Sequence, residues 1–146
     1  MCNNQNPPAP PPKPTLPKIV TITLSATNAV PEPLTITDTE GHTANTSEGD
    51  AALTTFASRG DTIRWDRIEG ITAIRIYRKS GPNLFSRLTP PDNGLPQAAT
   101  WVGVVDANAL FNQLESYSID YYVTGQNNPD GTNKLFTQDP RIEIKP

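Results

Sequence analysis

The stretch DTIRWDRIEGITAIRIYRK, residues 61–79, decides the fold that the sequence predicts. In its first half Ile63 and Trp65 alternate with charged residues, and in its second half Ile74 and Ile76 alternate with an arginine and a tyrosine. A period of two places alternate side chains on opposite faces of a β-strand. The stretch therefore predicts two strands, each with one apolar face.

Further short runs with the same alternation or a β-rich composition lie on either side of it. They span residues 18–26, 32–38, 51–58, 100–106, 116–124 and 140–145. Clusters of Gly, Pro, Asn and Asp separate the runs and are typical of turns. About eight short strands with one polar face each indicate an all-β domain over residues 18–146. We expect an antiparallel Greek-key β-sandwich of the immunoglobulin or cupredoxin type.

Two segments interrupt the strand pattern. Residues 107–115 carry apolar side chains at helical spacing after Asp106, a candidate N-cap, and they predict one short helix at an edge or end of the sandwich. The connection 80–99 is rich in proline and contains an Asn-Gly pair. We expect this connection to be a turn-rich excursion without a strand or helix.

Residues 1–17 differ from the rest of the chain in composition. Residues 3–17 contain seven prolines and a single strongly apolar side chain, Leu16. Proline fixes φ and removes a backbone donor, so this segment favours extended polyproline II over helix or sheet. We expect a disordered Pro-rich tail or tether, and a ligand for a proline-binding groove is the less favoured reading.

The composition argues against several classes of function. Twelve Lys and Arg against fifteen Asp and Glu give a net charge of −3, whereas a nucleic-acid-binding protein needs a basic face. No apolar run approaches the roughly 20 residues of a membrane helix. One His and one Cys argue against a histidine-based catalytic triad, a zinc cage and a blue-copper site. We expect no catalytic residue, no cofactor and no metal site, with calcium binding by the acidic loop 38–50 left open.

Three aromatic side chains are candidates for a binding surface. Tyr77 and Tyr122 have the opposite parity to the apolar residues of their runs, which predicts that they face solvent. Trp101 is the third candidate. Exposed aromatic rings on a sheet stack on sugar rings or form protein interfaces. We therefore expect a carbohydrate or protein ligand at these residues.

Several of these runs together resemble a known protein family. The runs are KIVTITL (18–24), GDTIRW (60–65), AIRIY (73–77), SYSIDYYV (116–123) and LFTQDPRIEI (135–144). Over residues 18–145 the chain resembles the bacterial inclusion-body proteins of the PixA/AidA family, and it departs from them in its Pro-rich N-terminal extension. The resemblance implies a β-sandwich without known catalytic activity, often accumulated as dense inclusions. It supplies no catalytic residues.

The first functional hypothesis is a non-enzymatic bacterial β-sandwich protein that acts by self-association or by accessory binding. Edge strands are the natural places for self-pairing, so a homo-oligomer is one expected assembly. An enzyme, as a carboxylate-dependent hydrolase, is the least favoured reading.

The second hypothesis is a surface lipoprotein with a carbohydrate- or protein-binding sandwich on a Pro-rich tether. Cys2 precedes that tether, where an exported lipoprotein would carry its lipid. No apolar signal segment precedes Cys2 in this sequence, so the chain as it stands points to the cytoplasm. If Cys2 is the processed N-terminus, the expected location is the outer membrane or the cell surface.

Overall fold

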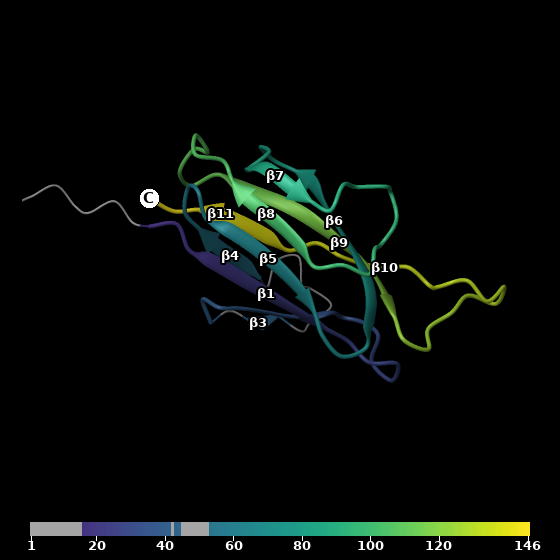
Figure 1. Cartoon of the computed structure of the whole chain (residues 1–146). Coiled ribbons are helices and arrows are strands. Elements are labelled where there is room, and N and C mark those ends of the chain that lie inside the picture. Colours follow the sequence, from purple (N-terminus) through teal and green to yellow (C-terminus); the bar gives the residue numbers. More distant parts are fainter. Residues whose placement is uncertain (1–15, 42, 45–52) are drawn as a thin grey trace, which may run out of the picture.

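The computed structural model describes residues 16–41, 43–44 and 53–146, and these residues form two β-sheets packed face to face (Figure 1). The all-β class and the sandwich predicted from the sequence are confirmed. Most of the Pro-rich segment 1–17, including Cys2, lies outside the described residues. The same is true of the second half of the acidic loop 38–50.

All eight predicted runs contain a strand, and three short strands that were not predicted join them. The strands are β1 (Ile19–Ser25), β2 (Thr35–Asp38), β3 (Thr43–Ala44), β4 (Thr54–Ala57), β5 (Thr62–Arg67), β6 (Ile71–Ser80), β7 (Phe85–Thr89), β8 (Trp101–Val105), β9 (Leu114–Val123), β10 (Phe136–Gln138) and β11 (Arg141–Ile144). The unpredicted ones are β3, β7 and β10, each of five residues or fewer.

The two sheets have different strand orders. The first sheet runs β3-β2-β1-β5-β8-β7. In the second sheet β9 pairs with β6 on one side and with β10 and β11 on the other, and β11 pairs with β4. As a result, β7 ends the first sheet and β6 ends the second.

Two of the strand pairs are parallel, β1 with β5 and β4 with β11, so the sheets are mixed rather than purely antiparallel. A parallel pair needs a long crossover between its strands. Three strands separate β1 from β5 along the chain, and six separate β4 from β11. The alternation of apolar residues predicts which face of a strand is buried, but it carries no information on strand direction.

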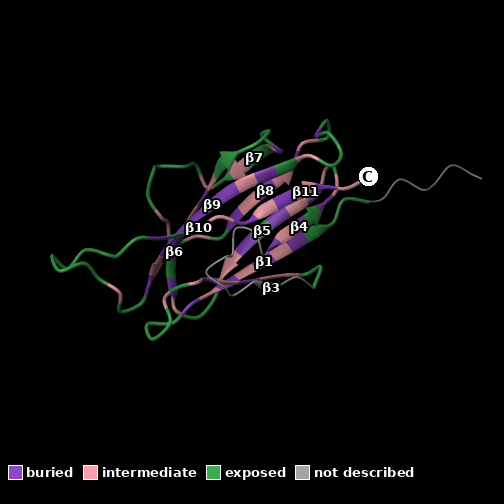
Figure 2. Cartoon of the chain, turned by 180° about the vertical axis from the view of Figure 1, so that it is seen from behind, coloured by how far each residue is buried: buried purple, intermediate pink, exposed green. Residues whose placement is uncertain are grey.

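The core lies between the two sheets. Buried and partly exposed residues alternate along the strands in Figure 2. Trp65 of β5 is fully buried and packs edge-on against Tyr117 of β9 and Phe85 of β7. Its indole N–H donates to the Tyr117 hydroxyl at 3.2 Å, so the polar atoms of both rings are satisfied inside the core. This aromatic cluster joins the first sheet to the second beside the edge strands β6 and β7.

The short helix predicted over residues 107–115 is wrong. The segment forms turns up to Gln113, and β9 begins at Leu114. The Asp106 side chain accepts from the Asn108 N–H in a local turn, and Asn112 adopts a left-handed φ of 60°. Asn112 also donates its N–H to the Ile144 carbonyl of β11, which draws the segment into the sheet. Asp106 therefore begins a turn, for which Asp is as well suited as for an N-cap.

The prediction that the connection 80–99 contains no element is also wrong, because it contains β7. β7 pairs with β8 through a bulge between Phe85 and Arg87. Gly103 of β8 makes room for it, since a Cβ there would lie 2.8 Å from the Phe85 ring. Phe85 and Leu88 both pack against the core although they are three residues apart, because the bulge changes the parity between them, so the sequence of β7 shows no period of two.

Candidate functional site

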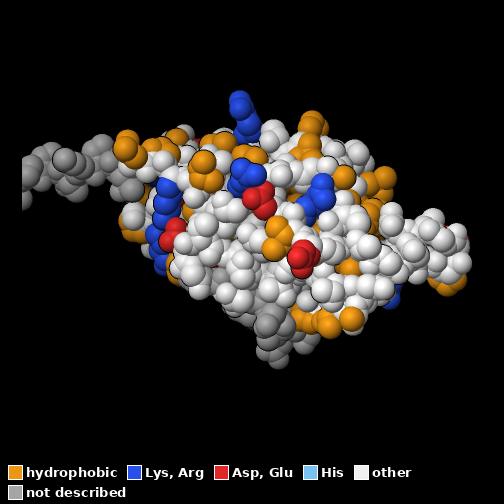
Figure 3. Space-filling model, turned by 60° about the horizontal axis from the view of Figure 1, so that its bottom comes forward, with side chains coloured by type: hydrophobic (Ala, Val, Ile, Leu, Met, Phe, Trp, Pro, Cys, Tyr) orange, Lys and Arg blue, Asp and Glu red, His pale blue; other side chains and the backbone are white. Residues whose placement is uncertain are grey.

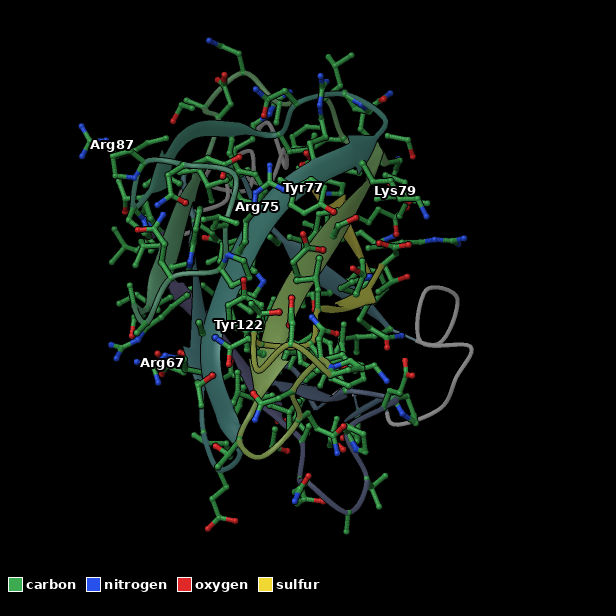
Figure 4. All side chains as sticks on the ribbon, turned by 90° about the vertical axis from the view of Figure 1, so that its right-hand side faces the viewer. Arg67, Arg75, Tyr77, Lys79, Arg87 and Tyr122 are labelled. Atoms are coloured by element: carbon green, nitrogen blue, oxygen red, sulfur yellow. The ribbon has the colours of Figure 1, made fainter. Side chains whose placement is uncertain are left out.

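Two of the three predicted binding residues lie on one surface. Tyr77 of β6 and Tyr122 of β9 are both half-buried on the outer face of the second sheet. Figure 4 shows Tyr77 beside Arg75, with Tyr122 further along the same face. Both tyrosines therefore lie on the outer face, as their parity predicts.

Trp101 corrects the sequence expectation, because its side chain is fully buried. It lies opposite Trp65 in the β5–β8 pair, and its indole N–H donates to the Ile74 carbonyl at 2.9 Å. In β8 both parities are apolar or small, so alternation alone gives no direction for the ring. Trp101 is a core residue and does not contribute to an exposed surface.

Tyr77 belongs to a polar network on the outer face of the second sheet. Its hydroxyl donates to the Asp120 carboxylate at 3.0 Å, and the Thr137 hydroxyl donates to the same oxygen at 2.7 Å. The Arg75 guanidinium lies 3.6 Å from the other Asp120 oxygen and 4.1 Å from the Tyr77 ring centroid. Burial, with the Asp120 hydrogen bond, raises the pKa of the Tyr77 phenol above its ordinary value.

The network continues from β6 into the loop that follows β7. Arg75 donates two hydrogen bonds to the Asp92 carboxylate, at 2.8 and 2.9 Å. This paired arrangement is the strong geometry for an arginine and a carboxylate. The hydrogen bonds from Arg75 lower the pKa of the Asp92 carboxyl, and they raise that of Arg75. Asp92 is therefore held as a carboxylate whose charge is balanced.

A cleft of about 370 Å³ opens next to this network, between β6 and β7. Its volume lies at the lower end of the range of ligand pockets, about 300 to 1,000 Å³. The residues that line it are Ile76, Tyr77, Arg78, Asn83, Phe85, Ser86, Arg87, Leu88, Asp92, Glu115 and Tyr117. The cleft thus combines an aromatic and aliphatic wall with charged groups of both signs.

Glu115 of β9 is the most unusual residue of the cleft. Its side chain has the inward parity of Tyr117, and the residue is only 1% exposed. Among the described residues only the Leu84 N–H donates to its carboxyl group, at 3.4 Å. Burial raises the pKa of Glu115 to about 7, although that N–H and Arg78 counteract the shift. The group therefore changes its charge near neutral pH.

The turn between β6 and β7 builds the end of the cleft nearest Glu115. Gly81 in this turn has a φ of +91°, and a Cβ there would lie 2.5 Å from the Leu114 carbonyl oxygen. Only glycine fits such a close approach in this conformation. The approach brings Leu84 within reach of the Glu115 carboxyl group.

Two arginines supply positive charge to the cleft. Arg78 has the inward parity of Ile76, and its guanidinium donates to the Gly81 carbonyl at 3.1 Å. Arg87 projects from β7, apart from Arg75 and Tyr77 (Figure 4). In the part of the chain that the structure describes, neither Arg78 nor Arg87 forms an ion pair with a carboxylate. Both guanidinium groups are thus available to a ligand.

Some of the described charged residues on the first sheet pair with one another. Figure 3 brings the lower face of Figure 1 forward and shows basic and acidic side chains scattered among hydrophobic side chains and uncharged or backbone atoms, as far as its residues are coloured. On the first sheet, Arg64 pairs with Asp66 at 2.8 Å, and Lys18 pairs with Glu40 at 2.6 Å. The β6–β7 side is therefore the more distinctive surface.

Sequence reasoning missed Glu115, Arg78 and Arg87. Parity carried a signal for the first two, because Glu115 is two residues before Tyr117 and Arg78 is two residues after Ile76. The signal is a charged residue on a parity that is otherwise apolar. Arg87 had no such signal, since its strand was not predicted.

Other predicted features lie partly or wholly outside the described residues. Cys2, the predicted lipid attachment point, is outside them, as are Glu48 and Asp50 of the acidic loop. Within residues 16–41, 43–44 and 53–146, no three His, Cys, Asp or Glu side chains are grouped as metal ligands. The same residues contain no helix of the length and apolarity needed to cross a membrane.

Comparison with known proteins adds no family to this description. No family model matches the chain, and the curated proteins contain no significant match. The resemblance to the PixA/AidA inclusion-body proteins therefore stays a prediction that rests on the short runs given above.

Proposed function

We propose that this chain is a non-enzymatic β-sandwich protein that acts by accessory binding, with its ligand in the cleft between β6 and β7. The observation that carries the proposal is the set of groups around one opening. An aromatic wall, two arginines that form no ion pair with a carboxylate of the described residues, and the buried carboxyl of Glu115 meet there. A few polar groups on an apolar wall are typical of a binding pocket.

Both expected ligand classes suit these groups. A sugar ring stacks on exposed aromatic rings and uses arginine and carboxyl groups for its hydroxyls. A protein segment uses the same arginines and the apolar wall made by Phe85 and Leu88. The outer-face network of Tyr77 and Asp120 borders the cleft and widens the surface available to either ligand.

The test is to close the cleft chemically and measure binding. Full-length protein in a Cys2→Ser background carries Ser86→Cys at the cleft wall, labelled with a bulky maleimide. Labelled and unlabelled proteins are compared on a glycan array and an immobilised peptide library. We expect the label to abolish the binding seen without it.

A matched control carries Ala29→Cys with the same label, because Ala29 is exposed and does not line the cleft. This control should bind as the unlabelled protein does. Ligands that bind equally well to both labelled proteins would place the binding surface elsewhere and contradict the proposal.

Self-association is the second candidate function, and a specific surface favours it. Leu114 of β9 and Phe56 of β4 flank Glu143 in one row on the outer face of the second sheet. They are 40% and 36% exposed, and Phe111 in the nearby turn is 42% exposed. Exposed apolar side chains that gather on one face often mark an interface between proteins.

The lipoprotein hypothesis is a variant of the same binding proposal. In this variant, residues 1–17 form a tether between the sandwich and a lipid that is attached to Cys2. Intact-mass measurement of the protein from its native host tests this variant. A mass that matches an acylated Cys2 supports it, and an unmodified Cys2 rejects the anchored form.

A further inference from the structure

The edge of β6 that borders the cleft is only partly covered. At Ile74 the loop after β7 forms a two-way bridge. The Ile74 N–H donates to the Gln97 carbonyl at 3.0 Å, and the Gln97 N–H donates to the Ile74 carbonyl at 2.7 Å. This bridge occupies the backbone groups of Ile74 on the side away from β9.

The next backbone groups on the same edge face the cleft. In a strand the N–H and C=O directions alternate from residue to residue. Because Ile74 directs both groups away from β9, Ile76 and Arg78 do the same, while Arg75 and Tyr77 bond to β9. On that edge, the described part of the chain contains no backbone partner for Ile76 or Arg78. Both residues line the cleft.

The charge around this free edge favours an acidic partner. Arg78 lies on the edge itself, and Arg87 lies across the cleft on β7, each without a carboxylate partner among the described residues. The Asp92 charge is balanced by Arg75. Glu115 loses its charge as the pH falls below about 7. The cleft therefore attracts negative groups.

We propose that the cleft receives an extended acidic peptide segment, which adds to the second sheet as a strand along Ile76–Arg78. This inference rests on the proposed function and names its ligand class. Hydrogen bonds from the free edge provide main-chain recognition, as in other cases of strand addition. Carboxylates of the segment pair with Arg78 and Arg87, and its apolar side chains contact Phe85 and Leu88.

A second copy of the chain fits this edge less well than an acidic partner. Pairing β6 with β6 would bring together two copies of Arg78, whose guanidinium forms no ion pair with a carboxylate of the described residues. Like charges on paired strands are destabilising. The Gln97 bridge also shortens the free edge to the part beyond Ile74, which suits a short segment rather than a whole strand of ten residues.

The test uses defined peptides and full-length protein in isothermal titration at pH 6.5. The probe is a capped peptide of alternating valine and glutamate, Val-Glu-Val-Glu-Val. Two derivatives carry N-methyl groups on the valines only or on the glutamates only. In an added strand the backbone N–H groups of alternate residues only point toward β6, and an N-methyl group removes such a donor. One derivative should therefore bind at least tenfold more weakly than the parent peptide, and the other within about twofold of it.

A charge-reversal variant tests the arginine contact. Arg87→Glu should weaken the acidic peptide at least tenfold and improve binding of Val-Lys-Val-Lys-Val. Arg64→Glu introduces the same change of charge on the outer face of the first sheet and should leave both affinities unchanged. Circular dichroism confirms that both variants are folded.

Three outcomes would overturn this inference. They are the absence of binding by the acidic peptide, equal losses for both N-methyl derivatives, and unchanged affinity in Arg87→Glu. If glycans or other ligands then still lose binding when Ser86→Cys is labelled, the proposed function holds and only the peptide class is rejected. If the label affects no ligand, the proposed function itself fails.

Discussion

A buried carboxyl group such as that of Glu115 links the stability of a protein to pH. Its pKa is raised by burial from 4.5 to about 7 in the folded state. Between these two values the folded state binds the proton more tightly than the unfolded state does. The free energy of unfolding therefore decreases as the pH rises through this window, by at most about 3 kcal/mol.

Glu115→Gln should remove this dependence, because glutamine is neutral at every pH and still accepts from the Leu84 N–H. Urea denaturation at pH 5 and pH 8 measures it. We expect the variant to be more stable than the wild type at pH 8 and to lose that advantage at pH 5. Glu143→Gln, on the solvent-facing parity of β11, is the control. Its free energy of unfolding should change between pH 5 and pH 8 as that of the wild type does. If Glu115→Gln keeps the wild-type dependence of the free energy of unfolding on pH, other groups cause that dependence.

The Tyr77 hydroxyl provides a second test at the scale of one residue. Tyr77→Phe removes the hydrogen bond to Asp120 and should lower the free energy of unfolding by about 1 kcal/mol. Tyr122→Phe is the matched control, since among the described residues its hydroxyl has no hydrogen-bond partner. Equal stability of the two variants would mean that the network around Asp120 does not stabilise the sheet.

Residue-level reasoning from the sequence succeeded where a strand had one clearly apolar parity. Ile63, Trp65, Ile74 and Ile76 are all buried as the alternation predicted. It failed for Trp101, whose strand is apolar or small on both parities. Around the candidate site, the sequence predicts the outward position of Tyr77 but not the charged residues of the cleft. Their position depends on how two edge strands from different sheets approach each other, which no local pattern encodes.

At the scale of elements, the turn between β6 and β7 fixes the shape of the cleft. Gly81→Ala would place a Cβ 2.5 Å from the Leu114 carbonyl oxygen at a φ of +91°. We expect it to lower the free energy of unfolding by about 2–3 kcal/mol through strain and displacement of the turn. Denaturant titration measures the loss.

Gly94→Ala is the matched control, since its φ is +83° but no atom of the described residues lies within 4 Å of the added Cβ. It should cost only about 1 kcal/mol, the penalty of the left-handed backbone. Similar losses in Gly81→Ala and Gly94→Ala would contradict the close approach of the turn to β9.

The sequence predicted the existence of most elements better than their connections. Every run with clear alternation forms a strand, whereas β7 is missed because its two apolar residues, Phe85 and Leu88, are three residues apart around a bulge. The predicted helix at 107–115 failed because Asn112 turns the chain left-handed and hydrogen-bonds to β11. Both errors arose where contacts with a distant strand outweigh local propensity.

At the scale of the whole molecule, the two functional candidates predict different assemblies. Binding of a ligand in the cleft requires only a monomer, whereas self-association requires the mass of the particle to increase with protein concentration. Light scattering coupled to size exclusion over a wide concentration range separates them. We expect a constant monomer mass. If the protein instead forms an oligomer that Phe56→Ser and Leu114→Ser together abolish, self-association becomes the leading function.

The central claim is that the edge of β6 beyond Ile74 is free to receive a ligand, and amide hydrogen exchange tests it directly. In the free full-length protein, the amides of Ile76 and Arg78 should exchange much faster than those of Arg75 and Tyr77, which bond to β9. With the acidic peptide present, the Ile76 and Arg78 amides should become protected. Equal protection of all four amides in the free protein would contradict the account, because the edge would then already be occupied.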